Sequence, residues 1–571
     1  MTTRSMKLRS LLFSFKNLKF FSMDYLLKHG YFDFKYSKQY EEDYILSNFV
    51  YKKIFNTEQL AKAFYEIEKK VNFKSFIDTT PIELSIYKNE IERRTYKLPN
   101  LYSYISLCKH LNKHSSTYLE IIAQNQQSLS KYFHSPFFIG KQKREENRFG
   151  KKHILKTDIQ NFYPSVYTHS IPWVLVGKKE AKDNKRDKNL YYNELDSLIQ
   201  RCQKGETHGL PTGSFATRLI AEVYMCKLDE IMKKFSYVRY VDDFEFSYND
   251  ESEKGEFFKE LNLELNKLNL KIKAEKTQID TFPFQGDNNS AFFFDYFLNI
   301  DNLDDQTKRI YNFIDSAIYK EREGYKGALK LMFKSLKSNV ENTHISEESF
   351  TSHIFKQLFN LVLMTPHLSV YFLEFIEVLS EDAINNLLKR SLKHMVPQIQ
   401  NNIDRYLELN YHQELYSLLS IFVFIGHYEV CSFDQLMKIL CSMDDLSSIL
   451  AFELIICIES NIDSVLFESI EKKLENSLCW EDELWLFKYH FFLRLNEDKR
   501  SKLHKEYKNF IYQKYDNGVE KSKFFNPKNL ALINSPLILS TQNRNSDSDI
   551  NTLFNQLLNN KVYFYEGKCR H

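Results

Sequence analysis

The stretch VRYVDDFEF, residues 238–246, places two aspartates side by side within a run of strand-forming residues. Aromatic and β-branched residues flank Asp242 and Asp243 on both sides, which predicts a β-hairpin with the carboxylates at its tip. Adjacent like charges repel, and burying them is costly unless a counter-charge is present. Two interpretations remain open: a tight turn with exposed aspartates, or carboxylates that bind a metal ion. The second interpretation requires another acidic segment.

That segment is LKTDIQNFYPSV, residues 155–166, in which strand-forming residues lead to Asp158. Between it and the hairpin lies THGLPTGSFATRLIAEVY, residues 207–224, a Gly-Pro-Gly turn that opens a helix. A lysine-bearing segment, LKIKAEKTQI, follows at residues 270–279. Chance explains this order of four segments far less readily than it explains any one of them.

The predicted elements divide the chain into two regions, 1–300 and 305–571. Residues 1–150 read as mostly helical, and residues 151–300 read as an α+β layer in the order β, α, ββ, α, β. After about residue 305 the pattern predicts successive short amphipathic helices. Such helices suit a solenoid of stacked pairs, with an irregular helical bundle as the alternative. The predicted elements of the α+β layer are strands at 153–159 and 270–279, helices at 214–235 and 254–269, and a hairpin at 237–246.

Composition sets outer limits on the class of protein. The chain has 571 residues, 43% of them apolar, with only 14 Gly and 11 Pro, which excludes a collagen-like or flexible-linker protein. Residues 1–300 contain 47 Lys and Arg against 38 Asp and Glu, a mild excess that suits a phosphate-rich partner. The sequence contains no run of about 18 apolar residues. We therefore expect no membrane partner and a cytoplasmic location.

The order of segments resembles the palm of reverse transcriptases. Asp158 matches the first metal aspartate of that family, and Asp242 and Asp243 match its Tyr-x-Asp-Asp pair. The resemblance implies a nucleotidyltransferase that uses dNTPs and two Mg²⁺ ions, with Mn²⁺ as a possible substitute. Two-metal phosphoryl transfer needs hard oxygen ligands on converging backbones, which explains why aspartates occupy these positions.

Further residues match nucleotide-binding positions of the family. Tyr163 falls where the family places the aromatic residue that senses the ribose, with an ordinary core aromatic as the less favoured alternative. Thr212 stands where the family usually has Gln, and Gly213 follows it and would let the backbone approach the nucleotide closely. Lys276 matches a lysine that contacts phosphate or donates a proton, with an ordinary surface lysine as the alternative.

Three further segments make the resemblance specific to one subfamily: ERRTYKLPNLYSY (92–104), YTHSIPW (167–173) and ETHGLPTG (206–213). Together with the hairpin and the helical remainder, they resemble the AbiK-type abortive-infection reverse transcriptases. That resemblance implies a HEAT-like helical domain after the fingers and palm, and a homo-oligomer. It also implies DNA synthesis without a template, primed by a protein tyrosine, and covalently attached single-stranded DNA. The implied role is defence of bacteria against phage, with a phage-derived trigger.

The priming tyrosine of that family lies in a variable N-terminal segment. Tyr44, in EEDYILSNF, is the best match, and Tyr40 is the second. Acidic residues before Tyr44 are the local support, and an ordinary half-buried ring is the alternative.

Basic residues in the predicted fingers complete the candidate site. Arg93 and Arg94 are expected to meet triphosphate oxygens, as charge-assisted bonds from guanidinium groups would allow. The alternative is that one of them pairs with a nearby acid such as Glu92 or Glu90.

Three functions of different classes remain in competition. The first is a protein-primed, untemplated DNA polymerase of phage defence. The second is a templated RNA-directed DNA polymerase of retron or intron type, which would be expected to show a compact thumb or a zinc-ligand cluster after the palm. The third is a non-enzymatic helical scaffold or phage sensor, which would have no need of all three aspartates.

Overall fold

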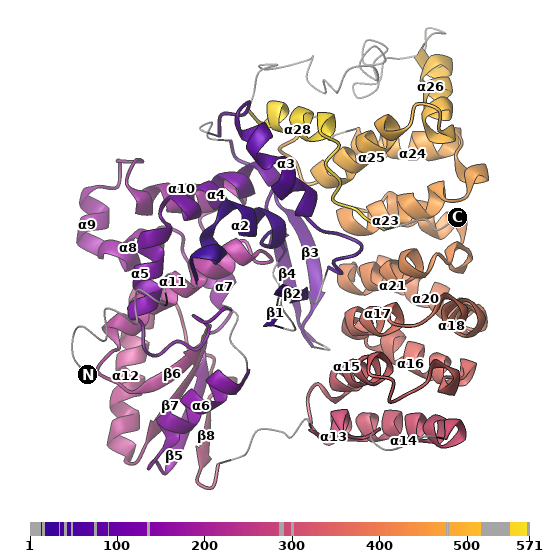
Figure 1. Ribbon diagram of the computed structural model, residues 1–571. Helices are drawn as coiled ribbons and strands as arrows, with labels where there is room; N and C mark the ends of the chain where they lie inside the picture. Colours follow the sequence, from indigo (N-terminus) through magenta and orange to yellow (C-terminus); the bar gives the residue numbers. More distant parts are fainter. Residues whose placement is uncertain are drawn as a thin grey trace.

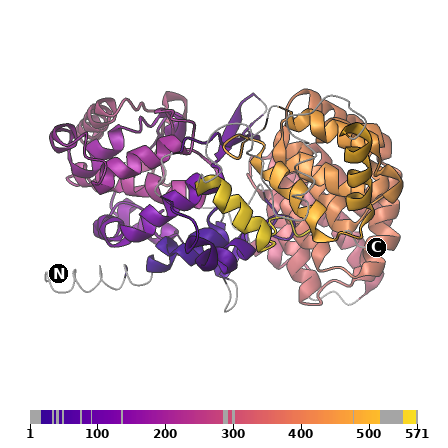
Figure 2. The ribbon, with the colours of Figure 1, turned by 90° about the horizontal axis from the view of Figure 1, so that it is seen from above.

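A computed structural model gives the fold of the chain. In Figure 1 the molecule consists of two lobes: a mixed lobe built from residues up to 284, and a column of helices that begins at α13 (Ala291–Phe294). Figure 2 shows the same two lobes side by side from above, with helix α28 between them. The structure describes residues 13, 17–32, 35–38, 43–46, 50–73, 77–89, 91–133, 137–284, 291–297, 302–475, 477, 479–515 and 549–567.

A four-stranded antiparallel sheet lies at the base of the mixed lobe (Figure 1). The strand order is β6-β7-β5-β8, so the hairpin β6–β7 lies beside β5. In the register, Asp158 at the end of β5 lies opposite Asp243 at the start of β7. This agrees with the predicted first strand and the predicted hairpin. The strands are β5 His153–Asp158, β6 Tyr237–Tyr240, β7 Asp243–Tyr248 and β8 Gln278–Thr281.

Two long helices of this lobe, α11 (Phe215–Ile231) and α12 (Glu251–Lys267), occur where the sequence predicts them. The hydroxyl of Ser214 caps α11 by accepting a hydrogen bond from the backbone N–H of Thr217 at 3.2 Å. Helix α12 packs on the sheet through Phe257, whose ring stacks on Phe246 with centroids 4.3 Å apart. Because the contact between Phe257 and Phe246 buries aromatic surface, it fixes α12 against the hairpin.

The predicted strand over residues 270–279 is wrong in part. The structure has a 3₁₀ turn at Ala274–Lys276, followed by the shorter strand β8. The turn begins after Lys273, whose backbone N–H donates to the carbonyl oxygen of Asp158 at 2.7 Å. It therefore brings Lys276 to the end of β5, where a continuous strand would have carried it past.

The N-terminal part is less uniformly helical than the sequence suggests. Helices α2 (Met23–His29), α3 (Glu58–Glu68), α4 (Leu101–Lys113), α5 (Ser115–Gln124) and α6 (Phe137–Arg148) occur with two antiparallel hairpins. The hairpin β3–β4 was not predicted, although residues 82–87 alternate between buried and more exposed side chains as a half-buried strand does. The hairpins are β1 Lys35–Lys38 with β2 Asp43–Leu46, and β3 Ile82–Tyr87 with β4 Arg93–Leu98.

From residue 302 onward, the described residues contain helices and no named strand. Figure 1 shows these helices stacked in a column, from α14 at the bottom to α26 at the top. We call this column the helical array. Its helices are α14 Leu303–Arg322, α15 Ala328–Glu341, α16 Ser352–Met364, α17 Ser369–Glu377, α18 Glu381–Ala383, a π-helical turn Ile384–Leu388, α19 Lys389–Lys393, α20 Val396–Glu408, α21 His412–Ile425, α22 Phe433–Leu440, α23 Asp445–Ile456, α24 Ser464–Leu474, α25 Trp485–Glu497 and α26 Lys502–Tyr515.

Helix α28 (Asp549–Asn559) crosses back to the mixed lobe (Figure 2). It packs against both α3 and α25. Its Phe554 stacks on Trp480 of the array with centroids 4.3 Å apart. Beyond the helix, the carbonyl oxygen of Phe564 accepts from the backbone N–H of Asn56 at 3.0 Å. The end of the chain thus joins the two lobes.

None of the described helices is by itself long and apolar enough to cross a membrane. The helix Ser352–Met364 and the segment Pro366–Glu377 meet the length and composition criteria only as a pair, and the pair is bent by 117°.

Candidate active site

Three carboxylates converge where β5 ends and the hairpin β6–β7 turns. Asp158 is the last residue of β5 and is buried, and its backbone faces that of Asp243 across the sheet. Asp242 lies in the turn just before Asp243, and its carbonyl oxygen accepts from the backbone N–H of Ile159 at 3.3 Å. The sheet register therefore brings together residues that lie more than 80 positions apart in the chain.

Burial and mutual repulsion raise the pKa values of two of these carboxylates. Burial, together with the charges of Asp158 and Asp243, raises the pKa of Asp242 to about 7. Burial and the charge of Asp158 also raise the pKa of Asp243, while Lys276 and Arg144 act in the opposite direction. A site that makes its own carboxylates hard to ionise is one in which a bound cation would restore their charge.

Lys276 is the cation placed directly on this cluster. Its Nζ lies 2.5 Å from Oδ2 of Asp158, and its side chain remains half exposed. The hydrogen bond to Asp158 raises the pKa of Lys276, which keeps the ammonium charged. One ammonium does not neutralise three carboxylates, and their oxygens are the hard ligands that Mg²⁺ and Mn²⁺ prefer. The residues present therefore fit divalent metal ions.

The turn that carries Asp242 is held in an unfavourable backbone conformation. Val241 has a φ of 57°, in the left-handed region that β-branched residues rarely occupy. Its backbone N–H donates to the hydroxyl of Ser130 at 2.9 Å, and its carbonyl oxygen accepts from Nη1 of Arg239 at 2.7 Å. Both backbone groups of the strained residue are thus fixed by side chains from outside the turn.

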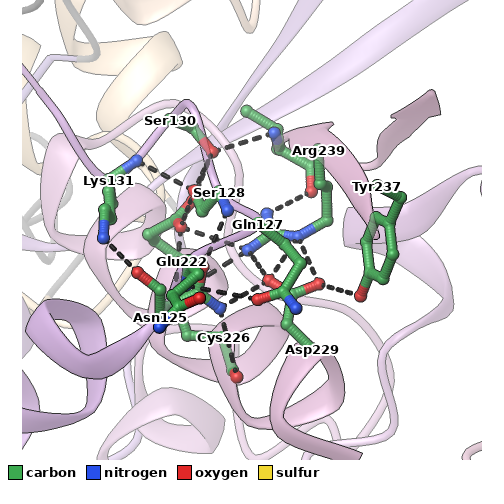
Figure 3. Close-up of polar contacts among 12 residues, drawn as sticks. Asn125, Gln127, Ser128, Ser130, Lys131, Glu222, Cys226, Asp229, Tyr237 and Arg239 are labelled. Carbon is green, nitrogen blue, oxygen red and sulfur yellow. Dashed lines mark hydrogen bonds and ion pairs between the residues drawn. The ribbon is translucent and has the colours of Figure 1, made fainter. Parts of the chain in front are cut away.

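These two side chains belong to a buried polar network, shown in Figure 3. Arg239 is fully buried and donates to Asp229 at 2.6 Å and to Glu222 at 3.2 Å. Ser130 donates to the other oxygen of Glu222 at 2.6 Å, and Tyr237 donates to Asp229 at 2.6 Å. Because both acids lie on α11, this helix supports the Asp242 turn through charged groups rather than through apolar packing alone.

Sequence reasoning did not single out this network. The sequence of α11 carries a signal for it, because Glu222 and Asp229 stand seven positions apart in this helix and both are buried. That spacing places them on one face, and buried acids require a partner. Their partner, Arg239, lies within the stretch VRYVDDFEF itself.

Tyr163 and the GLPTG turn lie against each other beyond β5. Tyr163 belongs to the short helix α7 (Phe162–Ser165), its ring is partly buried against the core, and its carbonyl oxygen accepts from the N–H of Leu210 at 2.8 Å. Thr212 uses its carbonyl oxygen to accept from the N–H of Lys97 at 2.7 Å. The β3–β4 hairpin therefore holds the turn that follows Tyr163.

Gly213 makes a close contact that the sequence did not predict. A Cβ atom at this position would lie 3.0 Å from Leu98 and 3.2 Å from Tyr96, and its φ is 129°. Strand β4 therefore approaches Gly213 too closely for a side chain, and the expected approach of a nucleotide stays a prediction. This packing sets the position of β4 relative to α11.

Arg93 has a partner that the sequence did not predict. Its guanidinium forms a two-pronged pair with Glu414 of α21, at 2.8 and 2.6 Å, and lies 3.9 Å from the ring centre of Tyr411. Its Nε donates to Ser85 at 2.5 Å. Arg93 therefore ties the β3–β4 hairpin to the helical array, with a partner more than 300 positions away rather than Glu92, and its expected triphosphate contact stays a prediction. Arg94 is exposed on the same strand.

The two candidate priming tyrosines are only partly within the described residues. The backbone of Tyr44 lies in β2, opposite Ser37 of β1. Tyr40 lies outside the described residues.

A family comparison covers the region that contains this site. Residues 88–313 match the model of the family described as reverse transcriptase (RNA-dependent DNA polymerase). These residues run from the end of β3 into α14 and contain the three aspartates, the GLPTG turn and Lys276. Residues 88–313 form a reverse transcriptase domain. The domain is a nucleotidyltransferase, a DNA polymerase of the reverse transcriptase type, and such domains use divalent metal ions, nucleotide substrates and nucleic acid.

Solved telomerase structures are similar to this chain at low scores. Apo telomerase from Candida tropicalis is 13% identical with a TM-score of 0.31, covering 64% of this chain and 75% of that chain. Telomerase from Candida albicans, in complex with a TWJ fragment of telomeric RNA, is 12% identical with a TM-score of 0.25, covering 65% and 72%. Likeness at these scores carries no conclusion about this chain. No curated protein matches it.

Proposed function

We propose that the protein is a template-independent DNA polymerase that primes synthesis from its own tyrosine and defends bacteria against phage. The observation that carries the polymerase part is the convergence of Asp158, Asp242 and Asp243 within a reverse transcriptase domain. Support for the untemplated and protein-primed part comes from the AbiK-like motifs at residues 92–104, 167–173 and 206–213.

In this proposal the aspartates bind two Mg²⁺ ions, for which Mn²⁺ could substitute. Such ions activate an attacking hydroxyl and stabilise the leaving pyrophosphate. Lys276, half exposed beside Asp158, is placed to contact phosphate oxygens of a dNTP. Tyr163 limits the space beside the sugar, and Thr212 and Gly213 set the position of strand β4 beside it. Arg93, and Arg94 exposed beside it on that strand, are the candidates for a triphosphate contact.

We further propose that the helical array is a HEAT-like repeat domain that replaces a thumb. Its helices α15, α17 and α21 pack on one another in order, as stacked repeats do. The array also joins the fingers through Arg93 and Glu414. The proposal also includes a homo-oligomer, because the resemblance to the AbiK-type family implies one. It further includes a phage-derived trigger and a location in the bacterial cytoplasm.

A single assay tests the proposed function. Purified full-length protein, freed of nucleic acid by nuclease treatment, is incubated with Mg²⁺ and labelled dNTPs. The expected result is labelled DNA that stays with the protein through heat and detergent. The Asp242→Asn, Asp243→Asn double variant is the control and should give no label. Incorporation that requires an added RNA template and primer would instead favour a retron- or intron-type enzyme, and no incorporation under either condition would favour the scaffold.

A further inference from the structure

Two histidines and a glutamate meet between α4 and α10 (Tyr191–Arg201), away from the three aspartates. His110 lies in the last turn of α4, and His114 caps that helix four positions later. This spacing places both imidazoles on one face of the helix. Glu194, in the first turn of α10, lies opposite them. One nitrogen of each imidazole and one oxygen of the carboxylate lie within 4.8 Å of one another.

One atom of this cluster has no hydrogen-bond partner. Among the described residues, Nε2 of His114 is buried and unpaired, and the nearest carboxylate oxygen, Oε2 of Glu194, is 3.7 Å away. A buried polar atom without a hydrogen-bond partner requires an explanation.

Two neighbouring side chains orient the His110 ring in the way that metal-binding histidines are usually oriented. Its Nδ1 lies 3.0 Å from Oε2 of Glu194, while its Nε2 lies 2.8 Å from the hydroxyl of Tyr118. Metal-binding histidines commonly use their second nitrogen for such a bond, which fixes the ring and its tautomer. Tetrahedral Zn²⁺ with N and O ligands holds neighbouring ligand atoms about 3.3 Å apart. Oε2 of Glu194 lies 3.0 Å from Nδ1 of His110 and 3.7 Å from Nε2 of His114, and these two separations lie on either side of that value.

We propose that His110, His114 and Glu194 bind one divalent transition-metal ion of the zinc class, with water in a fourth position. Two imidazole nitrogens favour Zn²⁺ over Mg²⁺, which requires oxygen ligands. The ion would give the unpaired nitrogen of His114 a partner and would clamp α4 to α10. Lys113 also lies 3.7 Å from Oε2 of Glu194, but its side chain is 64% exposed and can turn into solvent when the ion enters.

The test measures metal directly and needs no polymerase activity. Full-length protein is stripped with a chelator, dialysed against Zn²⁺ and then against buffer, and its metal content is determined. The wild type should retain one more equivalent of Zn²⁺ than His114→Gln or Glu194→Gln. Tyr118→Phe should bind Zn²⁺ about 10–100-fold more weakly, since it removes the group that orients His110. Co²⁺ in place of Zn²⁺ should give a visible absorption band that the His114→Gln variant lacks.

A matched control separates this cluster from other binding sites. His169→Gln changes a histidine that pairs with Asp196 at 2.5 Å outside the cluster, and this variant should keep the full metal content. Zn²⁺ should raise the melting temperature of the wild type and of His169→Gln, but not that of His114→Gln. Equal retention of Zn²⁺ by wild type and His114→Gln, with circular dichroism showing both folded, would overturn the proposal. Because all three measurements follow metal binding rather than DNA synthesis, failure here would leave the proposed polymerase untouched.

Discussion

The guanidinium of Arg239 donates a hydrogen bond to the carbonyl oxygen of Val241, the residue that precedes Asp242. Arg239 is itself fixed by two buried acids, so the position of the turn depends on charges in the core beneath it. The backbone N–H of Val241 is fixed in the same way by Ser130. This arrangement holds a strained turn in one conformation, which is what a metal-binding carboxylate at its tip requires.

Ser130→Ala tests that arrangement. The substitution removes the acceptor for the N–H of Val241, so the left-handed conformation loses one of its two supports. We expect a loss of about 1 kcal/mol of stability and a fall of about tenfold in nucleotide incorporation. Melting temperature and steady-state kinetics check both. Ser335→Ala is the control, because Ser335 is a fully buried serine of the helical array bonded to the carbonyl oxygen of Phe293. It should lose stability but keep activity, and equal activity losses in the two variants would contradict the positioning role.

The carboxylates themselves are tested by Asp242→Asn combined with Asp243→Asn. Amides bind Mg²⁺ far more weakly than carboxylates do, so incorporation should fall by at least about 10³-fold. The fold should persist because the change relieves the repulsion that raises the pKa of Asp242. Incorporation of labelled dNTP and circular dichroism measure the two effects. Activity that survives in the double variant would remove the aspartates from the chemistry.

The raised pKa of Asp242 also predicts how stability depends on pH. In the native state this pKa is about 7, above the ordinary value of about 3.9 expected in the unfolded chain. The native state therefore binds the proton more tightly, and the stability gained from it is complete below about pH 4 and is lost as pH rises through about 7. Without metal, Asp242→Asn should melt about 2–4 °C above the wild type at pH 8 and at the same temperature near pH 4. Saturating Mg²⁺ should shrink the difference at pH 8, and a difference that does not depend on pH would contradict this account.

Sequence patterns were sufficient for the parts of the fold that depend on local order. The strand before Asp158, the helix after GLPTG and the hairpin around Asp242 each carry their own signal within a few residues. The contacts that hold these parts together carry no such signal. Arg93 meets Glu414 across more than 300 positions, and the need for Gly213 arises from the approach of β4. Partners so distant in sequence are decided by packing, which a local pattern does not contain.

Tyr163 gives a test of sugar selection. If its ring limits the space beside C2′ of the incoming nucleotide, Tyr163→Ala should raise ribonucleotide incorporation relative to dNTP by about tenfold or more. Competition between a labelled dNTP and its ribonucleotide counterpart measures the ratio. The ring also packs partly against the core, so Tyr163→Phe, which keeps the ring, is the control and should preserve selection. A ratio unchanged by Tyr163→Ala, with the protein still folded, would assign the ring to the core alone.

The primer is tested at Tyr44. DNA synthesis needs a hydroxyl to begin from, and a tyrosine phenol is a competent nucleophile once it is deprotonated. We expect DNA joined to the protein through the phenolic oxygen of Tyr44. Nuclease digestion followed by peptide mass spectrometry should then find a nucleotide on the peptide that contains it. Tyr44→Phe should lose the product, because the change removes only that oxygen.

Tyr40→Phe is the matched control for Tyr44→Phe, because it deletes the same oxygen four positions away. It should make normal covalent product. If instead Tyr44→Phe makes normal product and Tyr40→Phe does not, the primer is Tyr40. DNA that is made but released by heat and detergent would contradict protein priming while leaving the three aspartates as the site of synthesis, and a templated enzyme would then be the better account.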